Sequence, residues 1–533
     1  MIANELDSRL IDALFDPGRY PHPVESVKLL ETHISWVLLA GEYAYKIKKP
    51  VNFGFLDFSE LSARQFFCHE ELRLNRRLAP ALYLDVVGIG GSVDQPIFGA
   101  ESAFEYAVKM RRFAEEMLLS HLLEHRLLRV ADIQNLAATM AGFHGKLPSA
   151  AIDGDYGNPE AVAQPARQNF LQLSRLLDRR YAERLENLRL GNEKEYQRCR
   201  AFFDRRLQDG RVRECHGDLH LGNIVMLGDS PTPFDGIEFN PNLRWIDVVN
   251  DIAFLLMDLQ HRQRPDLAFA FINAYLEIGG DYEGLVVLRF YLGYRAMVMA
   301  KVTAIRAAQL GRAASLSSCE SYLGLAEQFY SPSRPALMIT YGLPGCGKTM
   351  VSQIVIEKFR AIRLRSDVER KRLFGIPTQQ RSHSAIDGGI YTSEATERTY
   401  EHLLMLCRLI LQGGFNVIVD AAFLKHQERR QFQGLARALN LPFAILAISC
   451  DDTAVRERIF QRHIAGSDAS EADVAVYEKL KGAAEALTAD ELGFAIGVTN
   501  DSDIAFLSED AAVWEKVEKA INERQHRTDS PYS

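Results

Sequence analysis

The chain has 533 residues, 47% of them hydrophobic and 25% charged, which is the composition of an ordinary globular protein too long for one core. Its 62 basic and 70 acidic residues give a net charge of -8, which excludes a protein that coats nucleic acid along its whole length. No apolar run approaches the roughly 18 residues of a membrane helix, and the N-terminus MIANELDSRL lacks the basic-then-apolar order of a signal peptide. We therefore expect a cytoplasmic protein of several domains that has no contact with a membrane.

The cysteines are scattered along the chain and form no C-x-x-C pair. This pattern predicts reduced thiols rather than disulfides or a zinc site. Cys215 and Cys346 stand inside the two motifs described below, and small thiols of this kind are more often part of a core than sensors of oxidants.

The first elements expected along the chain are a strand pair, a helix and a third strand. The segments ISWVLLAG and YAYKIKKPV, which meet around Gly41 and Glu42, have the apolar pattern of a hairpin. Lys46 and Lys48 are two residues apart in the second strand and therefore share one face. A helix is expected in SARQFFCHEELRLNRRLAP, and EYAVKM at 105–110 is expected as a strand.

The most informative segment of this half is VRECHGDLHLGN at 212–223, which the apolar strand IVML follows. A kinase catalytic loop needs a carboxylate that accepts the proton of the substrate hydroxyl and, a few residues on, an asparagine that holds a metal ion. Asp218 and Asn223 fit these two roles, and His216 would brace the loop from behind. The alternative is a metal-binding cluster of His216, Asp218 and His220 that is unrelated to phosphate.

A second metal-binding side chain is expected shortly after this loop. In PFDGIEF, Asp235 stands where kinases place their metal-chelating aspartate, and Glu238 is a rival for the same metal. The motif H-G-D-x-x-x-x-N, continued by WIDVVNDIAFLLMDL at 245–259, resembles the aminoglycoside and choline phosphotransferase family of protein-kinase-like enzymes. The resemblance spans roughly residues 30–300 and is strongest at 215–255.

This resemblance implies an α+β bilobal kinase-like domain at 1–330, with an N-lobe at about 25–110 and a C-lobe at about 111–330. The strand EYAVKM would run into the hinge between the lobes, where backbone groups bind adenine. The chain departs from the kinase pattern at 32–35, where THIS stands in place of a glycine-rich loop. The acceptor groove would lie in the C-lobe helices.

The same resemblance assigns roles to charged residues of the N-lobe. Lys46 stands where the family has its ATP-binding lysine, and Lys48 is the alternative. Glu71, with Glu70 next to it, is the expected ion-pair partner. Asp251 is expected to support the catalytic loop structurally.

The clearest break in the chain is SPSRP at 331–335, which separates a helical pattern from the apolar strand ALMITY. We expect a second, α/β domain with a parallel sheet at 336–520. That strand is followed by a complete G-x-x-x-x-G-K-[ST] motif, whose glycines let backbone N–H groups surround a phosphate at a helix N-terminus. Lys348 would reach the β- and γ-phosphates, and Thr349 would ligate Mg²⁺. The nucleotide-binding residues of the motif are Gly342, Leu343, Pro344, Gly345, Cys346, Gly347, Lys348 and Thr349.

Two further strands of this domain are expected to end in an aspartate. IRLRSD ends in Asp367, which is placed to take the proton of an attacking hydroxyl or, alternatively, to act as a helix N-cap. Arg370, one turn further, would bind an anionic substrate. FNVIVD ends in Asp420, which resembles the metal-binding end of a Walker B strand, the alternative being a cap of the following turn.

A helix in DTAVRERIFQRH places Arg458 and Arg462 on one face, where they would stabilise charge on the transferred phosphoryl group or form a solvated basic face. The ordered set GLPGCGKT, RSDVER, VIVDAAFLKHQERR and RERIFQRH resembles P-loop kinases of the polynucleotide kinase and zeta-toxin type. The resemblance implies that Asp367 is the general base and that Arg370, Arg458 and Arg462 contact phosphate. That family phosphorylates hydroxyls of very different molecules, so the reaction type transfers and the acceptor does not.

The sequence therefore predicts a bifunctional enzyme that uses ATP and Mg²⁺ in both domains, with Asp218 and Asp367 as bases and a small molecule, a nucleotide or a polynucleotide end as acceptor. A second hypothesis makes one domain, more readily the N-terminal one, a nucleotide-binding regulator. A third is nucleic-acid 5′-hydroxyl end repair by the C-terminal domain, which has local basic residues for it. These residues are Arg363, Arg365, Arg370, Lys371, Arg372 and Arg381.

Overall fold

The computed structural model describes residues 5–54, 56–310, 313–377, 380, 388–465, 473–500 and 504–522. The chain divides into two compact units, Met1–Arg167 with Phe203–Asp258 and Gln168–Phe202 with Leu259–Ser533. The expected division at 331–335 follows the motifs rather than these units, and it stays a prediction. Within the described residues, no helix has the length and apolar character needed to cross a membrane.

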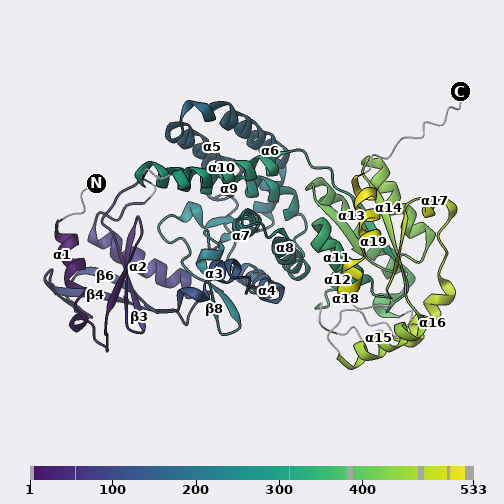
Figure 1. Ribbon diagram of the computed structural model, residues 1–533, viewed down its shortest axis with the longest axis horizontal. Helices are drawn as coiled ribbons and strands as arrows, with labels where there is room; N and C mark the ends of the chain where they lie inside the picture. Colours follow the sequence, from purple (N-terminus) through teal and green to yellow (C-terminus); the bar gives the residue numbers. More distant parts are fainter. Residues whose placement is uncertain are drawn as a thin grey trace. The chain divides into compact units, whose positions relative to one another are not determined.

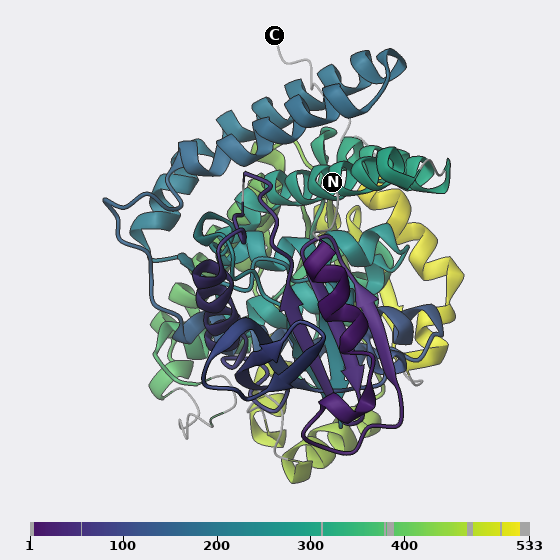
Figure 2. The same cartoon turned by 90° about the vertical axis from the view of Figure 1, so that its left-hand side faces the viewer.

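The first unit contains a six-stranded antiparallel sheet in the order β1-β2-β3-β6-β4-β5 (Figure 1). The strands are β1 (Val27–Glu31), β2 (Ser35–Ala40), β3 (Tyr43–Lys48), β4 (Tyr83–Ser92), β5 (Gln95–Phe98) and β6 (Ala103–Arg111). Because side chains alternate along a strand, neighbouring residues of β6 enter different cores. Ala107 packs with helix α1 (Glu5–Ala13), which Figure 2 shows in front of the sheet, and Val108 packs with helix α2 (Leu61–Asn75) on the other face.

The expected hairpin of the lysine pair is confirmed as β2 and β3, joined at Gly41. Gly41 has a φ of +57°, and a side chain there would bring a Cβ within 2.7 Å of the carbonyl oxygen of Pro23. The tight turn therefore needs glycine. It fixes the register in which Lys46 faces Val37 and Lys48 faces Ser35 across the strand pair.

Two short strand pairs hold the expected catalytic loop in the first unit. β7 (Val212–Glu214) pairs with β10 (Trp245–Asp247) on one side of the loop, and β8 (Ile224–Leu227) pairs with β9 (Ser230–Pro233) on the other. The helices that contribute to this unit are α3 (Leu119–Glu124), α4 (Val130–Lys146), and parts of α5 (Pro159–Leu176), α6 (Ala182–Gln208) and α7 (Val248–His261). The pairings bring the beginning of the loop next to α7 and its end next to the segment of Asp235.

The second unit contains a five-stranded parallel sheet in the order β12-β13-β11-β14-β15. The strands are β11 (Leu337–Tyr341), β12 (Ala361–Arg365), β13 (Asn416–Asp420), β14 (Phe443–Ser449) and β15 (Ala495–Thr499). Helices α11 (Lys348–Phe359), α18 (Ile504–Glu509) and α19 (Ala511–Asn522) share one core with the sheet, and α13 (Ser393–Gln412) and α14 (His426–Ala438) also pack on it (Figure 1). The inner strands β11, β13 and β14 are largely buried on both sides, whereas the edge strand β15 alternates between buried and exposed residues. The carboxyl ends of these parallel strands meet at one edge.

Besides its parts of α5, α6 and α7, this unit also contains α8 (Pro265–Gly279), α9 (Gly284–Leu310), α10 (Ala313–Tyr330), α12 (Ser366–Leu373), α15 (Asp452–Ala465), α16 (Val474–Ala483) and α17 (Ala489–Leu492). The segment SPSRP connects the end of α10 to β11, as the sequence predicts. The expected fold class, an α+β part followed by an α/β part with a parallel sheet, is confirmed.

Candidate active sites

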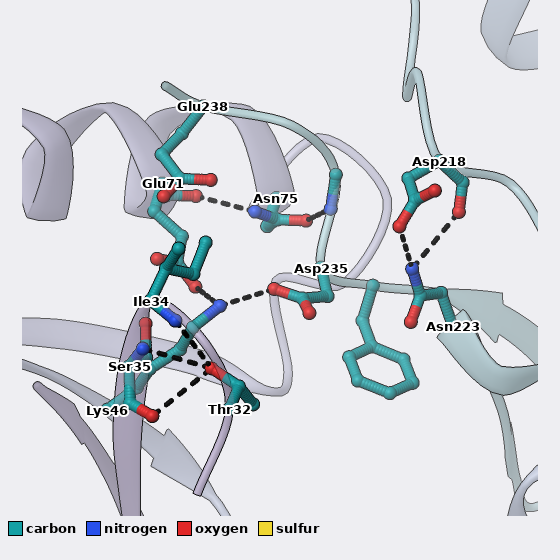
Figure 3. Close-up of polar contacts among 12 residues, drawn as sticks. Thr32, Ile34, Ser35, Lys46, Glu71, Asn75, Asp218, Asn223, Asp235 and Glu238 are labelled. Atoms are coloured by element: carbon teal, nitrogen blue, oxygen red, sulfur yellow. Dashed lines mark hydrogen bonds and ion pairs between the residues drawn. The ribbon is translucent and has the colours of Figure 1, made fainter. Parts of the chain in front are cut away.

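Lysines of β3 and carboxylates of α2 and PFDGIEF form one network in the first unit. Figure 3 shows the part of it around Lys46, Glu71 and Asp235. Lys46 Nζ donates to Glu71 Oε1 at 2.8 Å and to Asp235 Oδ1 at 2.5 Å. Lys48 Nζ donates to the other oxygen of Glu71 at 2.8 Å and also contacts Glu238. Each oxygen of Glu71 therefore holds one lysine, and each lysine reaches one acidic residue of PFDGIEF.

Burial makes the charges of this network depend on one another. Burial alone would raise the pKa of Glu71, but the two lysines lower it to about 2, so Glu71 is ionised. Burial opposes the charge of Lys46 and Lys48, but the surrounding carboxylates raise the pKa of both. Glu238 is the exception, because burial raises its pKa.

The geometry separates alternatives that the sequence left open. Lys48 is fully buried, whereas Lys46 is 9% exposed and reaches Asp235, whose side chain is 40% exposed. Lys46 is therefore the more accessible of the two lysines, and its role in nucleotide binding stays a prediction. Glu70 faces away from both lysines, since it binds Arg73 at 2.8 Å.

A cluster of arginines ties α2 to the strand before the catalytic loop. Glu214 of β7 accepts from Arg73 at 2.8 Å, from Arg77 at 3.2 Å and from Arg244 at 3.1 Å. Burial raises the pKa of Glu214, but these arginines outweigh burial and lower it. Because Glu71 and Arg73 lie on α2 and Arg77 follows the end of that helix, this cluster fixes the distance between Glu71 and the loop.

The catalytic loop brings Asp218 and Asn223 into direct contact. Asn223 Nδ2 donates to the carboxylate of Asp218 at 2.9 Å and to its backbone oxygen at 3.1 Å (Figure 3). His220 Nε2 lies 3.5 Å from the same carboxylate, and Asp218 raises the pKa of His220 against the effect of burial. Asp218 is therefore oriented by an amide and lies beside a histidine whose pKa it raises.

Buried groups brace this loop from behind. Asp251 accepts the backbone N–H of His216 at 3.1 Å and that of Gly217 at 2.8 Å, and His144 Nε2 lies 3.1 Å from it. His216 accepts the N–H of Asp218 at 3.3 Å, and its other ring nitrogen lies 2.9 Å from the oxygen of Phe234. These contacts confirm the bracing expected of Asp251 and His216.

The backbone of Asp235, the residue expected to chelate a metal, is held in a left-handed conformation by hydrogen bonds. Asp235 has a φ of +60°, and its N–H donates to Tyr83 Oη at 3.1 Å, while the next N–H, of Gly236, donates to Asn75 Oδ1 at 2.8 Å. The carboxylate points toward Lys46 (Figure 3). Asn223 uses its amide nitrogen on Asp218, so its amide oxygen and the carboxylate of Asp235 are the groups that would hold Mg²⁺ here.

The alternative of a phosphate-independent metal cluster gains no support. Among the described residues, the group of potential ligands that gathers closely is His144, Cys215 and Asp251. Of the three residues proposed for such a cluster, His216, Asp218 and His220, none belongs to it.

A tight turn replaces the glycine-rich loop of kinases at 32–35. Thr32 Oγ1 accepts the N–H of Ser35 at 2.9 Å and that of Ile34 at 3.3 Å, and it donates to the oxygen of Ser35 at 3.1 Å (Figure 3). The backbone donors that a glycine-rich loop would offer to phosphates are thus bound to a side chain of the turn itself.

The motif at 342–349, here called the P-loop, has the left-handed backbone conformations that its glycines allow. Gly345 and Gly347 have φ values of +81° and +95°. A Cβ on Gly345 would lie 2.9 Å from Val455, and one on Gly347 would lie 1.8 Å from Asn500 Nδ2. Lys348 folds over the loop, where its Nζ donates to the backbone oxygens of Gly342 at 3.1 Å and Leu343 at 2.9 Å.

Most of the predicted P-loop residues line one cavity of about 1170 Å³, which we call the P-loop site. The lining residues foreseen from the sequence are Pro344, Gly345, Gly347, Lys348, Thr349, Asp367, Arg370, Asp420 and Arg458. Cys346 lies in the core instead, where its side chain is 3% exposed and packs among apolar neighbours. Gly342 and Leu343 contribute backbone oxygens to Lys348 rather than cavity surface.

The two aspartates of the P-loop site lie at the ends of neighbouring strands. Helix α12 begins at Ser366, so Asp367 lies in its first turn and is not its N-cap residue. Asp367 accepts from Arg365 at 3.0 Å. Asp420 is 6% exposed, and burial raises its pKa although Arg365 opposes this. With Thr349 it supplies oxygen ligands suited to Mg²⁺.

The described arginine side chains of the P-loop site form hydrogen bonds with neighbouring protein groups. Arg370 donates to the oxygen of Ile390 at 2.8 Å, and burial lowers its pKa. Arg458 donates to the oxygen of Asn500 at 3.0 Å and contacts Cys450 Sγ at 3.2 Å. The side chain of Arg462 lies outside the described residues.

Several residues of this site were not foreseen. Asn500 follows β15 directly, donates to the oxygen of Cys346 at 2.9 Å and so ties the P-loop to Arg458. Its position after a parallel strand is a signal that could have identified it. Tyr400 and Lys479 also line the cavity, and their helical segments show amphipathic pattern alone. Lys425 lines it too, at the N-cap of α14 inside the motif VIVDAAFLKHQERR.

In comparisons with known proteins, the two segments that contain these sites match two different family models. Residues 67–290 match the model of the phosphotransferase enzyme family, and residues 337–487 match the model of an AAA domain. Rv2004c of Mycobacterium tuberculosis is 29% identical over 465 residues, which are 84% of this chain and 89% of that protein.

Solved structures cover the two parts separately. Choline kinase of Cryptosporidium parvum covers 60% of this chain and 94% of its own at 11% identity and a TM-score of 0.40. APS kinase of Mycobacterium tuberculosis covers 35% of this chain and 99% of its own at 19% identity and a TM-score of 0.26. The family matches confirm both resemblances: the chain is a kinase-type phosphotransferase in which a segment of the phosphotransferase enzyme family precedes a P-loop segment of the AAA-domain model.

Proposed function

We propose that the chain is a bifunctional phosphotransferase, whose two sites each transfer the γ-phosphate of ATP to a hydroxyl acceptor. The N-terminal site comprises Lys46, Glu71, Asp218, Asn223 and Asp235. The observation that supports the proposal at the N-terminal site is that Lys46 binds Glu71 and Asp235 while Asn223 binds Asp218. At the P-loop site, Lys348, Thr349, Asp367 and Asp420 line one cavity.

At the N-terminal site, Asp218 would accept the proton of the acceptor hydroxyl. The amide of Asn223 fixes its carboxylate at 2.9 Å, and His220 Nε2 lies 3.5 Å from it. Lys46, ionised and supported by Glu71, would bind the phosphates of the nucleotide. These groups act by positioning and by charge neutralisation.

At the P-loop site, Asp367 would take the corresponding proton. Lys348 would leave its two backbone oxygens to bind the β- and γ-phosphates, and Arg458 would neutralise charge on the transferred group. The buried guanidinium of Arg370 would hold an anionic group of the acceptor.

The residues present fit Mg²⁺ and ATP at both sites. The P-loop is a glycine cradle that a Cβ would fill, and Thr349 with Asp420, like Asn223 with Asp235, offers the oxygen donors that Mg²⁺ selects. When bound, Mg²⁺·ATP supplies the phosphoryl group and offsets its negative charge.

A nucleotide-binding regulatory role for the N-terminal domain is the second candidate. It is favoured by the turn at Thr32, whose hydroxyl takes the N–H groups of Ile34 and Ser35. The nucleic-acid reading is less favoured, because its basic residues are engaged inside the protein. Arg363 and Arg365 bind Glu277, Arg370 and Lys371 are buried, and Arg381 lies outside the described residues.

The proposal is tested with the full-length chain and its Asp218→Asn and Asp367→Asn variants in a metabolite and 5′-hydroxyl oligonucleotide phosphorylation screen. Each variant is expected to lose one phosphorylated product and keep the other. If Asp218→Asn changes no transfer while Asp367→Asn removes all of it, the regulatory role of the N-terminal domain replaces its catalytic one. If neither change affects any transfer, both assignments are wrong.

A further inference from the structure

Helix α8, inside the segment that matches the phosphotransferase family, contacts the edge strand of the parallel sheet. Asn273 Nδ2 donates to the oxygen of Ala361 at 3.0 Å, and the N–H of Arg363 donates to Asn273 Oδ1 at 2.7 Å. The Asn273 amide thus makes the two bonds that a neighbouring strand would make with β12. Both elements belong to the same compact unit.

One helical turn further along α8, Glu277 reaches the side chains that leave β12. Its two oxygens lie 3.3 Å from Arg363 Nη2 and 3.3 Å from Arg365 Nη1. The other terminal nitrogen of Arg365 lies 3.0 Å from Asp367 Oδ2. A chain of ion pairs therefore runs from Glu277 through Arg365 to the proposed base of the P-loop site.

The backbone at the end of α8 makes a second contact with this region, at α12. The backbone oxygen of Glu277 accepts from Arg372 Nη2 of α12 at 2.5 Å. The left-handed Gly280, with a φ of +70°, leaves room for this side chain, since a Cβ there would lie 2.7 Å from Arg372 Nε. Because Asp367 and Arg372 belong to α12, Glu277 contacts this helix directly at Arg372 and reaches Asp367 indirectly through Arg365.

We propose that Glu277 is a positioning residue for the P-loop reaction, contributed by the phosphotransferase-family segment. Arg365 stands between two carboxylates, and Glu277 shares its charge and fixes its direction. Without Glu277, Arg365 turns fully to Asp367 and draws its carboxylate away from the acceptor hydroxyl. This inference rests on the proposed function of the P-loop site, and it means that residues outside the P-loop segment complete that site.

The test measures ATP turnover by the full-length protein, with water or a screened acceptor. All proteins carry Asp218→Asn, so that the turnover measured comes from the P-loop site alone. Glu277→Gln is expected to lower kcat about tenfold while KM for ATP stays within about twofold, because the base and not the nucleotide is misplaced. Asp266→Asn is the matched control, since it removes a carboxylate of the same helix that pairs with Arg264 at 2.7 Å. Hydrogen exchange of residues 366–373 should rise several-fold in Glu277→Gln and not in the control.

A double-mutant cycle with Arg365→Ala decides whether Glu277 acts through that arginine. In the Arg365→Ala background, Glu277→Gln is expected to have no further effect on kcat. Independent, multiplicative effects, or equal kcat and exchange in Glu277→Gln and the parent, would overturn the inference. Lys348→Ala separates the two proposals: turnover that persists in this variant overturns the P-loop assignment itself, whereas turnover lost in it but unchanged in Glu277→Gln overturns the role of Glu277 alone.

Discussion

The carboxylate of Asp251 accepts the backbone N–H of Gly217 at 2.8 Å, one residue before the proposed base of the N-terminal site. Burial alone would raise the pKa of Asp251, but its bond to His144, the nearby His216 and this N–H lower it from 3.8 to about 2. A carboxylate whose pKa is lower in the folded chain stabilises that chain above the unfolded pKa and stops doing so as the pH falls.

Asp251 is therefore expected to contribute about 2 kcal/mol at neutral pH, of which about 1 kcal/mol is lost by pH 3. The measurement is urea unfolding of the wild type and of Asp251→Asn at pH 7, 5, 4 and 3. The difference in unfolding free energy between the two proteins should shrink as the pH falls. A difference that stays constant would contradict the assignment of this carboxylate.

The second lysine of β3 predicts a stability effect. Lys48→Met leaves Glu71 and Glu238 buried without this partner, which is expected to cost about 3–5 kcal/mol of unfolding free energy, and adding Glu238→Gln should recover part of it. Lys49→Met is the control, because its partner Glu31 is 58% exposed and such pairs contribute about 1 kcal/mol or less. An equal loss for both lysine variants in urea unfolding would refute the prediction.

The P-loop predicts an effect on nucleotide binding. Gly347→Ala introduces a Cβ that would overlap Asn500 at a φ of +95°, so binding of Mg²⁺·ATP at the P-loop site should be lost. Calorimetric titration should then give one binding site per chain where the wild type gives two. Gly434→Ala, with nothing within 4 Å of its Cβ, should keep both sites. Two intact sites in Gly347→Ala would be the contrary result.

The arginine cluster around Glu214 predicts a loss of activity at a distance. Glu214→Gln should loosen α2 and with it the pair of Glu71 and Lys46, so we expect turnover at the N-terminal site to fall several-fold and KM for ATP to rise. Turnover at the P-loop site should stay unchanged. Glu186→Gln, which removes an exposed partner of Arg189 at 2.6 Å, provides the comparison. Identical N-terminal kinetics in both variants would argue against the tether.

The cysteines predict an order of reactivity. Burial raises the pKa of Cys215 and of Cys346 and shields both thiols, whereas Cys450 is partly exposed. Iodoacetamide at pH 8 should therefore modify Cys450 first, as mass spectrometry of the native chain can show. Urea-unfolded protein should react at every cysteine. Alkylation of Cys346 as fast as Cys450 in the native chain would reopen a redox role for the P-loop.

The parts of the site that depend on fixed spacing could be predicted from the sequence. Asp218 and Asn223 are five residues apart in one loop, and the P-loop is a single continuous turn, so local geometry alone brings their groups together. Strand ends are nearly as informative, because parallel strands carry Asp420 and the segment of Asp367 to the same edge.

Contacts between distant segments could not be predicted in the same way. The pattern of β3 shows that Lys46 and Lys48 share a face, but which carboxylate each one binds depends on the packing of α2 against the sheet. Asn273 and Glu277 look like ordinary polar residues of an amphipathic helix. Their partners on β12 are more than 80 residues away in the sequence, and the local pattern of apolar residues cannot reveal contacts at such a separation.

The amide of Asn273 has a consequence for any attempt to divide the chain. A fragment that starts at the P-loop domain loses α8 and leaves the outer side of β12 with unmatched N–H and C=O groups, which is a template for pairing with a second molecule. Such a fragment should self-associate increasingly as its concentration rises, whereas a fragment that keeps α8 covers this edge of β12.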